Sequence, residues 1–226
     1  MIRNQNPTKL TRNLSRISSE NHFFNYSMIR NEFPSMANDT LDNWIGKLLP
    51  NTRLIIEPLI LGCQTVLFYK NGCLTKGFYR REYESFIDLK RIRNIPHQLH
   101  LDIDVKIRGQ IYHPGFLALS NNARKCPLRY LKTNEEELNF CSFQIINSDQ
   151  NHYQSLIELK KLGFEVPSAE FTTITSQVYM YMQLFKDRKI FEHYPAEGIV
   201  LKVNSRKLQK QMGENNLFVN WAYAVK

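Results

Sequence analysis

Two lysines near the end of the chain have the type and spacing to form an anion-binding site. Lys202 ends the segment that begins at Glu197, and Lys226 ends the segment that begins at Trp221. Apolar residues alternate around each lysine, which predicts that each one stands at the end of a strand and projects into a cleft. Two cations that converge on one point would bind a phosphate group.

Two earlier segments carry polar side chains between apolar ones. Glu57 lies in an apolar segment that ends at Gly62, and Arg108 and Gln110 lie in an alternating segment that ends at Tyr112. Both segments are predicted to be strands, so their polar side chains would be held by the backbone of a sheet.

The elements that must position these residues form an α+β pattern. Asn71-Gly72 between two β-prone runs predicts a hairpin, because both residues tolerate a positive φ. Antiparallel hairpins with interspersed helices favour an α+β domain over a parallel sheet. The expected helices are residues 40–49, 85–93, 152–162 and 176–189, and the expected strands are 53–60, 65–69, 73–79, 101–112, 139–147, 198–203 and 218–226.

Composition and charge narrow the class of protein. The 226 residues are 42% hydrophobic and 23% charged, which excludes a collagen, a disordered acidic chain and a disulfide scaffold. No apolar run approaches the ~18 residues of a membrane span, so we expect no membrane partner. The net charge of +9 suits a polyanionic partner such as nucleic acid. A merely basic protein remains the alternative.

The spacing of cysteines and histidines gives little indication of a metal site. The four cysteines form no C-x-x-C pair, so we expect no zinc and reduced thiols. His97, His100 and His113 lie near acidic residues, but strand alternation points these groups outward. The prediction for metal is therefore none.

Residues 1–33 are expected to be a basic N-terminal extension or targeting segment, followed by one domain over 34–226. The first 19 residues contain Arg3, Lys9, Arg12 and Arg16 and no acid. This pattern is typical of an organelle transit peptide, or of a basic arm that touches nucleic acid. We therefore expect a cytoplasmic or nucleoid protein, with an organelle matrix as the alternative.

In this order, the short segments resemble the adenylation domain of the NAD-dependent DNA ligases, whose fold is the nucleotidyltransferase (ATP-grasp-like) fold. The family's first motif reads E-x-K-x-D-G, and Glu57 and Gly62 match its ends. Arg108 and Gly109 match the strand motif V-R-G-E-V. The other matches are Arg80, the segments 92–96 and 128–131, Lys202-Val203-Asn204 in D-G-V-V-I-K-V-N, and Lys226 in W-A-x-A-x-K.

The departures from the family pattern concern its chemistry. In the family, the lysine of the first motif attacks the α-phosphate of NAD and carries AMP covalently. Leu59 occupies that place and has no nucleophilic atom. Leu61 replaces the aspartate of the same motif, and Gln110 replaces the glutamate of the strand motif. The resemblance also ends at Lys226, so we expect the further ligase modules to be missing.

The resemblance and the basic stretches together give the candidate site residues. We expect no catalytic residue, because the nucleophile position is Leu59. The nucleotide-binding candidates are Glu57, Arg80, Arg108, Gln110, Glu197, Lys202, Trp221 and Lys226. The nucleic-acid-binding candidates are Lys90, Arg91, Arg93, Arg129, Arg206 and Lys207.

Three hypotheses for function remain open at this point. The first is a catalytically inactive, ligase-like adenylation domain that acts as a binding or structural subunit with DNA, or with a protein of the replication or repair machinery. The second is a sensor that binds AMP or NAD non-covalently, and no other cofactor is expected. The third is an active DNA ligase (NAD+) or nucleotidyltransferase, with a substitute nucleophile or completed in trans by another chain.

Overall fold

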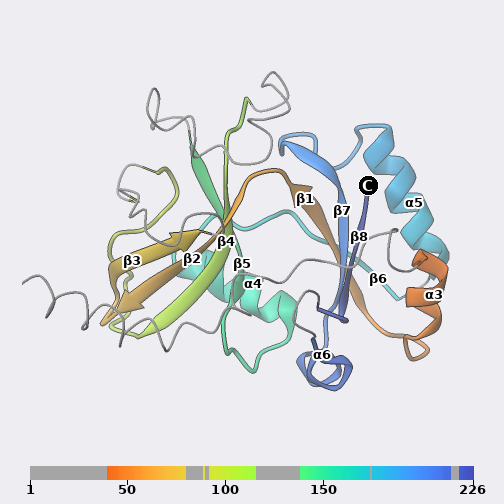
Figure 1. The fold of residues 1–226 in the computed structure, drawn as a ribbon, viewed down its shortest axis with the longest axis horizontal. Coiled ribbons are helices and arrows are strands. Elements are labelled where there is room, and N and C mark those ends of the chain that lie inside the picture. The colour runs from red at the N-terminus through yellow and green to blue at the C-terminus, as the bar shows by residue number, and fades with distance from the viewer. Residues whose placement is uncertain (1–39, 80–88, 90–91, 116–137, 174, 215–218) are drawn as a thin grey trace, which may run out of the picture.

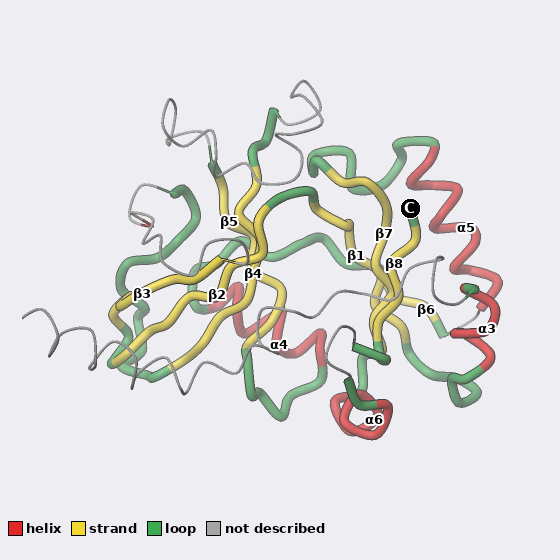
Figure 2. Tube along the Cα trace, in the orientation of Figure 1, coloured by secondary structure: helices red, strands yellow, loops and turns green. Residues whose placement is uncertain are grey.

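The computed structural model describes residues 40–79, 89, 92–115, 138–173, 175–214 and 219–226. Figures 1 and 2 show two antiparallel sheets side by side, with β1 leading from one sheet toward the other. The strands are β1 Leu54–Ile60, β2 Cys63–Lys70, β3 Cys73–Tyr79, β4 Val105–Tyr112, β5 Asn139–Ile145, β6 Glu170–Thr172, β7 Ala196–Val203 and β8 Ala222–Val225. The helices are α3 Leu41–Gly46, α4 His152–Lys161, α5 Thr175–Lys186 and α6 Arg206–Met212. The predicted α+β class with antiparallel sheets is confirmed.

The first sheet has the strand order β6-β1-β7-β8. Its two middle strands are buried along most of their length because one face packs on α3 and α5, which lie beside the sheet at the right of Figure 1. Trp44 of α3 lies against Tyr223 of β8, with ring centroids 5.6 Å apart. Apolar burial of this kind is the main source of stability in a domain.

The second sheet has the order β3-β2-β4-β5 and packs one face on α4. Asn71 and Gly72 form the β2–β3 turn with φ values of 48° and 73°, which confirms the predicted hairpin. Leu67, Ile107 and Leu159 are fully buried between this sheet and α4. Each sheet thus has its own hydrophobic core.

The helix ends follow their sequence signals. Thr40 caps α3, since its hydroxyl accepts from the Asn43 amide at 3.2 Å. Gly163 follows α4 with φ 92°, as expected for a left-handed residue after a helix. The predicted helices over 40–49, 152–162 and 176–189 are confirmed as α3, α4 and α5 with shorter bounds.

Two sequence expectations need correction. The strand expected over residues 101–112 begins only at Val105, and its supposedly wet face carries Arg108, which is buried. The expectation of reduced cysteines is wrong for Cys63, which is disulfide-bonded, whereas Cys73 and Cys141 are free. The residues expected to form a helix over 85–93 lie largely outside the described residues, as does the N-terminal extension. Among the described helices, none is both long and apolar enough to cross a membrane.

Candidate functional site

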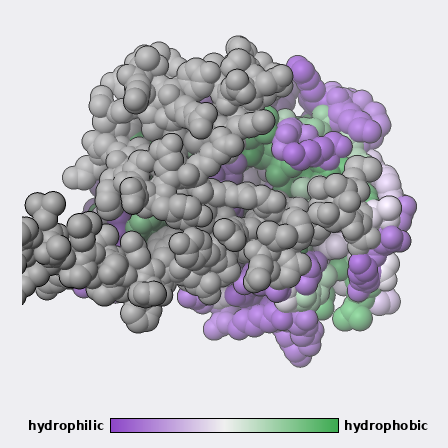
Figure 3. Space-filling model, in the orientation of Figure 1, coloured by the Kyte–Doolittle hydropathy of each residue, from purple (hydrophilic) through white to green (hydrophobic). Residues whose placement is uncertain are grey.

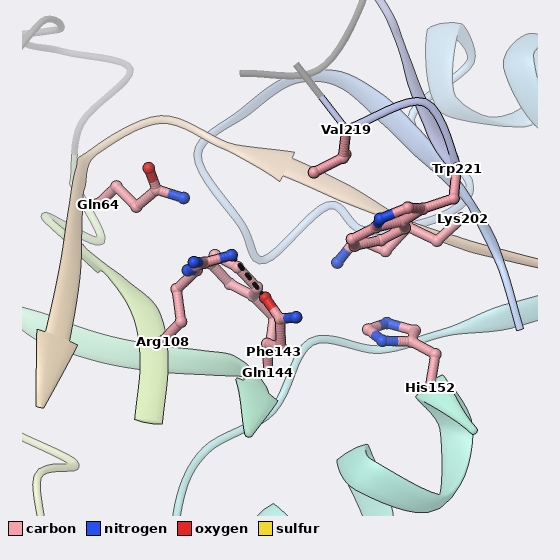
Figure 4. A pocket seen from close by; sticks show the side chains of 8 residues that line it. All are labelled: Gln64, Arg108, Phe143, Gln144, His152, Lys202, Val219 and Trp221. Carbon is pink, nitrogen blue, oxygen red and sulfur yellow. Dashed lines mark hydrogen bonds between the residues drawn. The ribbon is translucent and has the colours of Figure 1, made fainter. Parts of the chain in front are cut away.

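A small pocket lies where the two sheets meet. Figure 4 shows Gln64, Arg108 and Gln144 on one side of it, and Lys202, His152 and Trp221 on the other. Phe143 and Val219 complete the lining. The first group stands on β2, β4 and β5, whereas Lys202 stands on β7 and His152 begins α4. Residues from both sheets therefore build one site.

Glu57 of β1 makes short contacts with two residues that line this pocket, Lys202 and His152. Its carboxylate accepts from Lys202 Nζ at 2.5 Å through Oε2, and lies 2.5 Å from His152 Nε2 through Oε1. All three side chains are buried. Because an ionised carboxylate only accepts hydrogen bonds, His152 must donate through Nε2.

The protonation states of this trio follow from burial and charge. Burial alone would raise the pKa of Glu57, but the Lys202 charge and the His152 contact outweigh it and lower that pKa from 4.5 to about 2. Burial lowers the pKa of His152 below 6.5, so this ring is neutral near pH 7. The trio is therefore a buried Glu57–Lys202 ion pair with a neutral histidine bonded to it.

Lys202 and Arg108 give the pocket two buried cations. Lys202 Nζ lies 4.8 Å from the centre of the Phe143 ring, which is a cation–π contact. Arg108 Nη1 donates to Gln144 Oε1 at 2.7 Å, and burial lowers the pKa of Arg108 to about 10. Two cations beside the aromatic rings of Phe143 and Trp221 favour a flat, electron-rich ligand such as a nucleobase.

The free space in the pocket is small. It accommodates about one water molecule between the lining side chains. A nucleotide would therefore enter only if side chains such as Trp221 or Gln144 moved. The chemistry of the lining suits a nucleotide, whereas its present volume does not.

The position of Leu59 lies apart from this pocket, at the outer end of β1. The pairing of β1 with β7 shifts between Pro58, opposite Ile199, and Ile60, opposite Ala196. Leu59 therefore lies beside Glu197 and Gly198 at this irregularity. Its side chain is half-buried and packs against the core of the first sheet. An apolar contact thus replaces what the family pattern would make a charged nucleophile.

The glutamine at position 110 has also become part of the packing. Gln110 Nε2 donates to the carbonyl oxygen of Ile60 at 3.0 Å. An ionised glutamate could not make this bond, because a carboxylate has no proton to donate. Leu61 donates its amide to the carbonyl of Pro195 at 2.7 Å. Gln110 of β4 is thus bonded to the backbone segment 59–61, which carries the other two departures.

The two lysines do not converge, contrary to the sequence expectation. Antiparallel pairing places Lys202 opposite Ala222, and Ile199 opposite Val225, so Lys226 lies near Gly198. Four residues of strand separate the two positions, or about 14 Å. Lys202 binds Glu57 in the pocket, whereas Lys226 forms an exposed pair with Glu197 at 2.6 Å. The two lysines therefore do not form a common phosphate site in this structure.

The structure thus sorts the nucleotide-binding candidates into three groups. The pocket is lined by Arg108, Lys202 and Trp221, and Glu57 forms an ion pair with Lys202. Gln110, Glu197 and Lys226 lie toward the outer ends of β1 and β7. Arg80 lies outside the described residues.

The nucleic-acid candidates are dispersed. Arg93 is exposed and pairs by backbone with Asn139 at the start of β5. Arg206 is half-buried at the start of α6, where its Nε donates to the carbonyl of Ser148 at 3.0 Å, and Lys207 beside it is exposed. Lys90, Arg91 and Arg129 lie outside the described residues. The described candidates do not form one patch.

Sequence reasoning missed five lining residues: Gln64, Phe143, Gln144, His152 and Val219. His152 looked only like the first residue of an amphipathic helix. The reason it enters the site is tertiary, since its backbone amide donates to the carbonyl of Asn204 at 2.9 Å and anchors α4 beside β7. No pattern in the sequence could have signalled this contact. In the described part of the chain, no group of three or more His, Cys, Asp and Glu side chains is arranged to hold a metal ion.

Comparison with known proteins gives a consistent family. Residues 15–226 match the family model of the NAD-dependent DNA ligase adenylation domain. The chain is 30% identical over 217 residues to a DNA ligase of Borrelia garinii subsp. bavariensis. This alignment covers 83% of this chain and 33% of that protein. A DNA ligase of Endomicrobium trichonymphae is 29% identical over 207 residues, covering 78% of this chain and 31% of that protein. The chain thus spans about a third of the length of these relatives.

Solved structures give weaker matches. A structure from an analysis of Lig E DNA ligases aligns with a TM-score of 0.48 and 15% identity, over 80% of this chain and 64% of that chain. The ATP-dependent DNA ligase of bacteriophage T7, in complex with ATP, aligns with a TM-score of 0.48 and 12% identity, over 78% of this chain and 64% of that chain.

Proposed function

Because this chain belongs to the family of NAD-dependent DNA ligase adenylation domains, as its match over residues 15–226 shows, we propose that it is a member that has lost covalent adenylation and serves as a nucleic-acid-binding or structural subunit in DNA replication or repair. The observation that carries the proposal is the side chain at position 59. Adenylation requires an amine that attacks the α-phosphorus of NAD, and a leucine cannot supply one.

The surroundings of Leu59 support the loss of chemistry. A catalytic lysine needs polar groups that hold its charge and the phosphate. Here Leu61 stands where the family pattern has an aspartate, and Gln110 is an amide that is committed to the Ile60 carbonyl. Leu59 packs against the core of the first sheet. Apolar packing at a former reaction site stabilises a scaffold that no longer needs catalysis.

The glycines of the family motifs support retention of the scaffold. A Cβ on Gly62 would lie 2.2 Å from the Ile111 carbonyl oxygen, and one on Gly198 would lie 1.9 Å from the Val225 carbonyl oxygen. Both glycines are therefore required by close backbone approach. The fold accounts for them without any need for catalysis.

The partner class follows from charge. The chain carries 30 Lys and Arg against 21 Asp and Glu. A positive excess attracts the phosphate backbone and gives binding that weakens with salt. The DNA ligases that the chain resembles favour DNA as the polyanion.

Intact-mass spectrometry tests the loss of adenylation. The purified chain is incubated with NAD and, separately, with ATP, then measured under denaturing conditions. We expect no mass gain of one adenylyl group. We also expect none for Leu59→Lys, because Leu61 and Gln110 still replace the two carboxylates of the family pattern. An adduct on the unchanged chain would overturn the proposal and indicate a substitute nucleophile, and an adduct on Leu59→Lys alone would show that only the nucleophile had been lost.

Binding of a labelled DNA oligonucleotide tests the second half of the proposal. We expect binding at low ionic strength whose logarithm falls linearly with the logarithm of the salt concentration. The absence of binding at low salt would reject the nucleic-acid role.

A second candidate function is non-covalent binding of an adenine nucleotide such as AMP or NAD. The observation that favours it is the pocket, where Lys202 and Arg108 lie beside the rings of Phe143 and Trp221. Native mass spectrometry distinguishes this candidate, because a nucleotide retained under native conditions and lost on denaturation is bound without a covalent bond.

A further inference from the structure

The face of the second sheet that points away from α4 carries cations and aromatic rings that do not line the pocket between the sheets. Phe68 on β2 pairs with Lys76 on β3 and with Lys106 on β4, so the three side chains form one row across three neighbouring strands. Side chains opposite one another in a sheet lie on the same face. This row, Lys76–Phe68–Lys106, is called the cation–ring row below.

The contacts within the row are close. Lys76 Nζ lies 5.5 Å from the centre of the Phe68 ring, and Lys106 Nζ lies 5.5 Å from the same centre. Lys76 Nζ also lies 5.5 Å from the Phe78 ring, which meets Phe68 edge to face at 5.5 Å. Two ammonium groups are therefore held at a pair of aromatic rings on one sheet face.

This face is continuous with the candidate pocket. Arg108 lies two residues beyond Lys106 on β4, and Gln64 lies four residues before Phe68 on β2, so both stand on the same face as the row. The opposite face, which carries Leu67 and Ile107, is buried against α4. The row is thus an extension of the site face and not part of the sheet's core.

A groove runs along the row. Its volume is about 580 Å³, and its lining includes all three residues of the row together with Lys70, Asn147 and Ser148. Two carboxylates also line it, Asp104 and Glu158. Asp104 Oδ1 accepts from the Asn71 amide at 2.8 Å and so closes the hairpin turn. The lining of the groove thus carries three lysines, Lys70, Lys76 and Lys106, against two carboxylates.

We propose that this groove binds a single-stranded segment of nucleic acid, with a base stacked at Phe68 and the flanking phosphates at Lys76 and Lys106. Aromatic rings beside cations along a groove are the chemistry by which proteins hold single strands without reading their sequence. A duplex keeps its bases stacked inside, so it would not use the rings. This inference rests on the proposed nucleic-acid function and adds its surface and strandedness.

Fluorescence anisotropy with a labelled oligothymidylate longer than ~16 nucleotides tests the proposal. For Lys76→Ala/Lys106→Ala, we expect weaker binding and a slope of log affinity against log salt that is smaller by roughly 1.4, since each phosphate contact contributes about 0.7 for a single strand. For Phe68→Leu, we expect an affinity lower by about 5- to 150-fold with an unchanged slope, because a stacking surface is lost and no charge.

The matched control is Lys186→Ala/Lys189→Ala, which removes the same charge from exposed positions at the end of α5 and just after it, beside the first sheet. We expect it to change affinity little. Circular dichroism melting confirms that each variant is folded, and the lysine variants carry the test if Phe68→Leu is not.

Four results would overturn the inference. Equal losses in the control and in the Lys76→Ala/Lys106→Ala variant would show general charge attraction. An equal or higher affinity for a duplex of the same length would reject single-strand binding. Unaltered binding by all variants would place the nucleic acid elsewhere, while the proposed function would stand. If the unchanged chain binds no oligonucleotide at low salt, the proposed function and this inference both fail.

Discussion

Glu57 is the residue on which the centre of the molecule depends. Its carboxylate, only 2% exposed, holds Lys202 from the same sheet and His152 from α4. A buried carboxylate with two hydrogen-bonded partners cannot be removed without leaving the lysine charge unpaired. The three side chains therefore act as one unit that joins the two halves of the site.

Replacing this carboxylate predicts a large loss of stability. For Glu57→Gln, we expect the free energy of unfolding to fall by about 3–5 kcal/mol, because breaking a buried ion pair leaves Lys202 uncompensated. Urea denaturation followed by circular dichroism measures it. The matched control is Glu197→Gln, whose pair with Lys226 is exposed and should be worth about 0–1 kcal/mol. Similar losses for both variants would contradict a buried ion pair at Glu57.

The same unit predicts how stability depends on pH. His152 has a lowered pKa in the folded state, so the unfolded chain takes up this proton first and stability falls as the pH drops below about 6.5. Glu57 has a pKa lowered from 4.5 to about 2, so its contribution is present above pH 4.5 and is lost as the pH falls toward 2.

The histidine part of this prediction is checked by urea denaturation midpoints measured between pH 8 and pH 5. This range brackets the ordinary histidine pKa of ~6.5. We expect His152→Gln to be less stable than the unchanged chain at pH 8, and the difference between the two to shrink toward pH 5. A constant difference across this range would show that His152 does not lose its proton on folding.

At the scale of elements, the close pairing of β7 with β8 depends on a glycine. Gly198 has no side chain, and a Cβ there would lie 1.9 Å from the Val225 carbonyl oxygen. The same strand end brings Lys226 to Glu197. The close approach of the β7 and β8 backbones at Gly198 therefore brings Lys226 beside Glu197.

For Gly198→Ala, we expect a clear drop in melting temperature, because the backbone of β7 and β8 must separate to admit the methyl group. Gly46→Ala is the control, since nothing lies within 4 Å of the added Cβ. An alanine in a helix is favoured over glycine by about 0.5–1 kcal/mol. We therefore expect Gly46→Ala to leave the melting temperature unchanged or higher. A tolerated Gly198→Ala would show that the strands can shift apart at little cost.

At the scale of the whole molecule, the positive charge is spread along the chain and is not confined to the pocket. The described surface at the right of the space-filling view mixes hydrophilic and hydrophobic residues (Figure 3). Five large apolar side chains of the described residues are exposed, namely Leu49, Leu101, Tyr153, Tyr179 and Met180. The described basic candidates, Arg93, Arg206 and Lys207, do not form one patch, so the net charge of +9 acts as a general attraction to polyanions.

Thermal melting with two ligands distinguishes the candidate functions of the whole chain. A ligand that binds only the folded state at 100 times its dissociation constant stabilises it by about 2.7 kcal/mol. We expect a DNA oligonucleotide to raise the melting temperature at low salt and not at high salt. AMP bound in the pocket would instead give a rise that is largely independent of salt, because its contacts are buried. A rise with AMP alone would favour the nucleotide sensor over the proposed function.

The sequence by itself predicted the elements whose signals are local. Asn71-Gly72 indicated the hairpin because a tight turn needs two positive φ values. The apolar alternation of residues 101–112 indicated a strand because a strand repeats every two residues, although β4 begins only at Val105. Leu59 indicated the loss of the family's nucleophile because that chemistry depends on a single atom. Each of these conclusions depends on a few adjacent residues.

Only the tertiary structure decided which polar residues meet. It placed Glu57 against Lys202, 145 residues away in sequence, and against His152, 95 residues away. It also separated Lys202 from Lys226, although both had been expected at one point, because the antiparallel register carries the second lysine to the other end of β7. Register and helix docking depend on long-range packing, which the periodicity of a single segment does not specify.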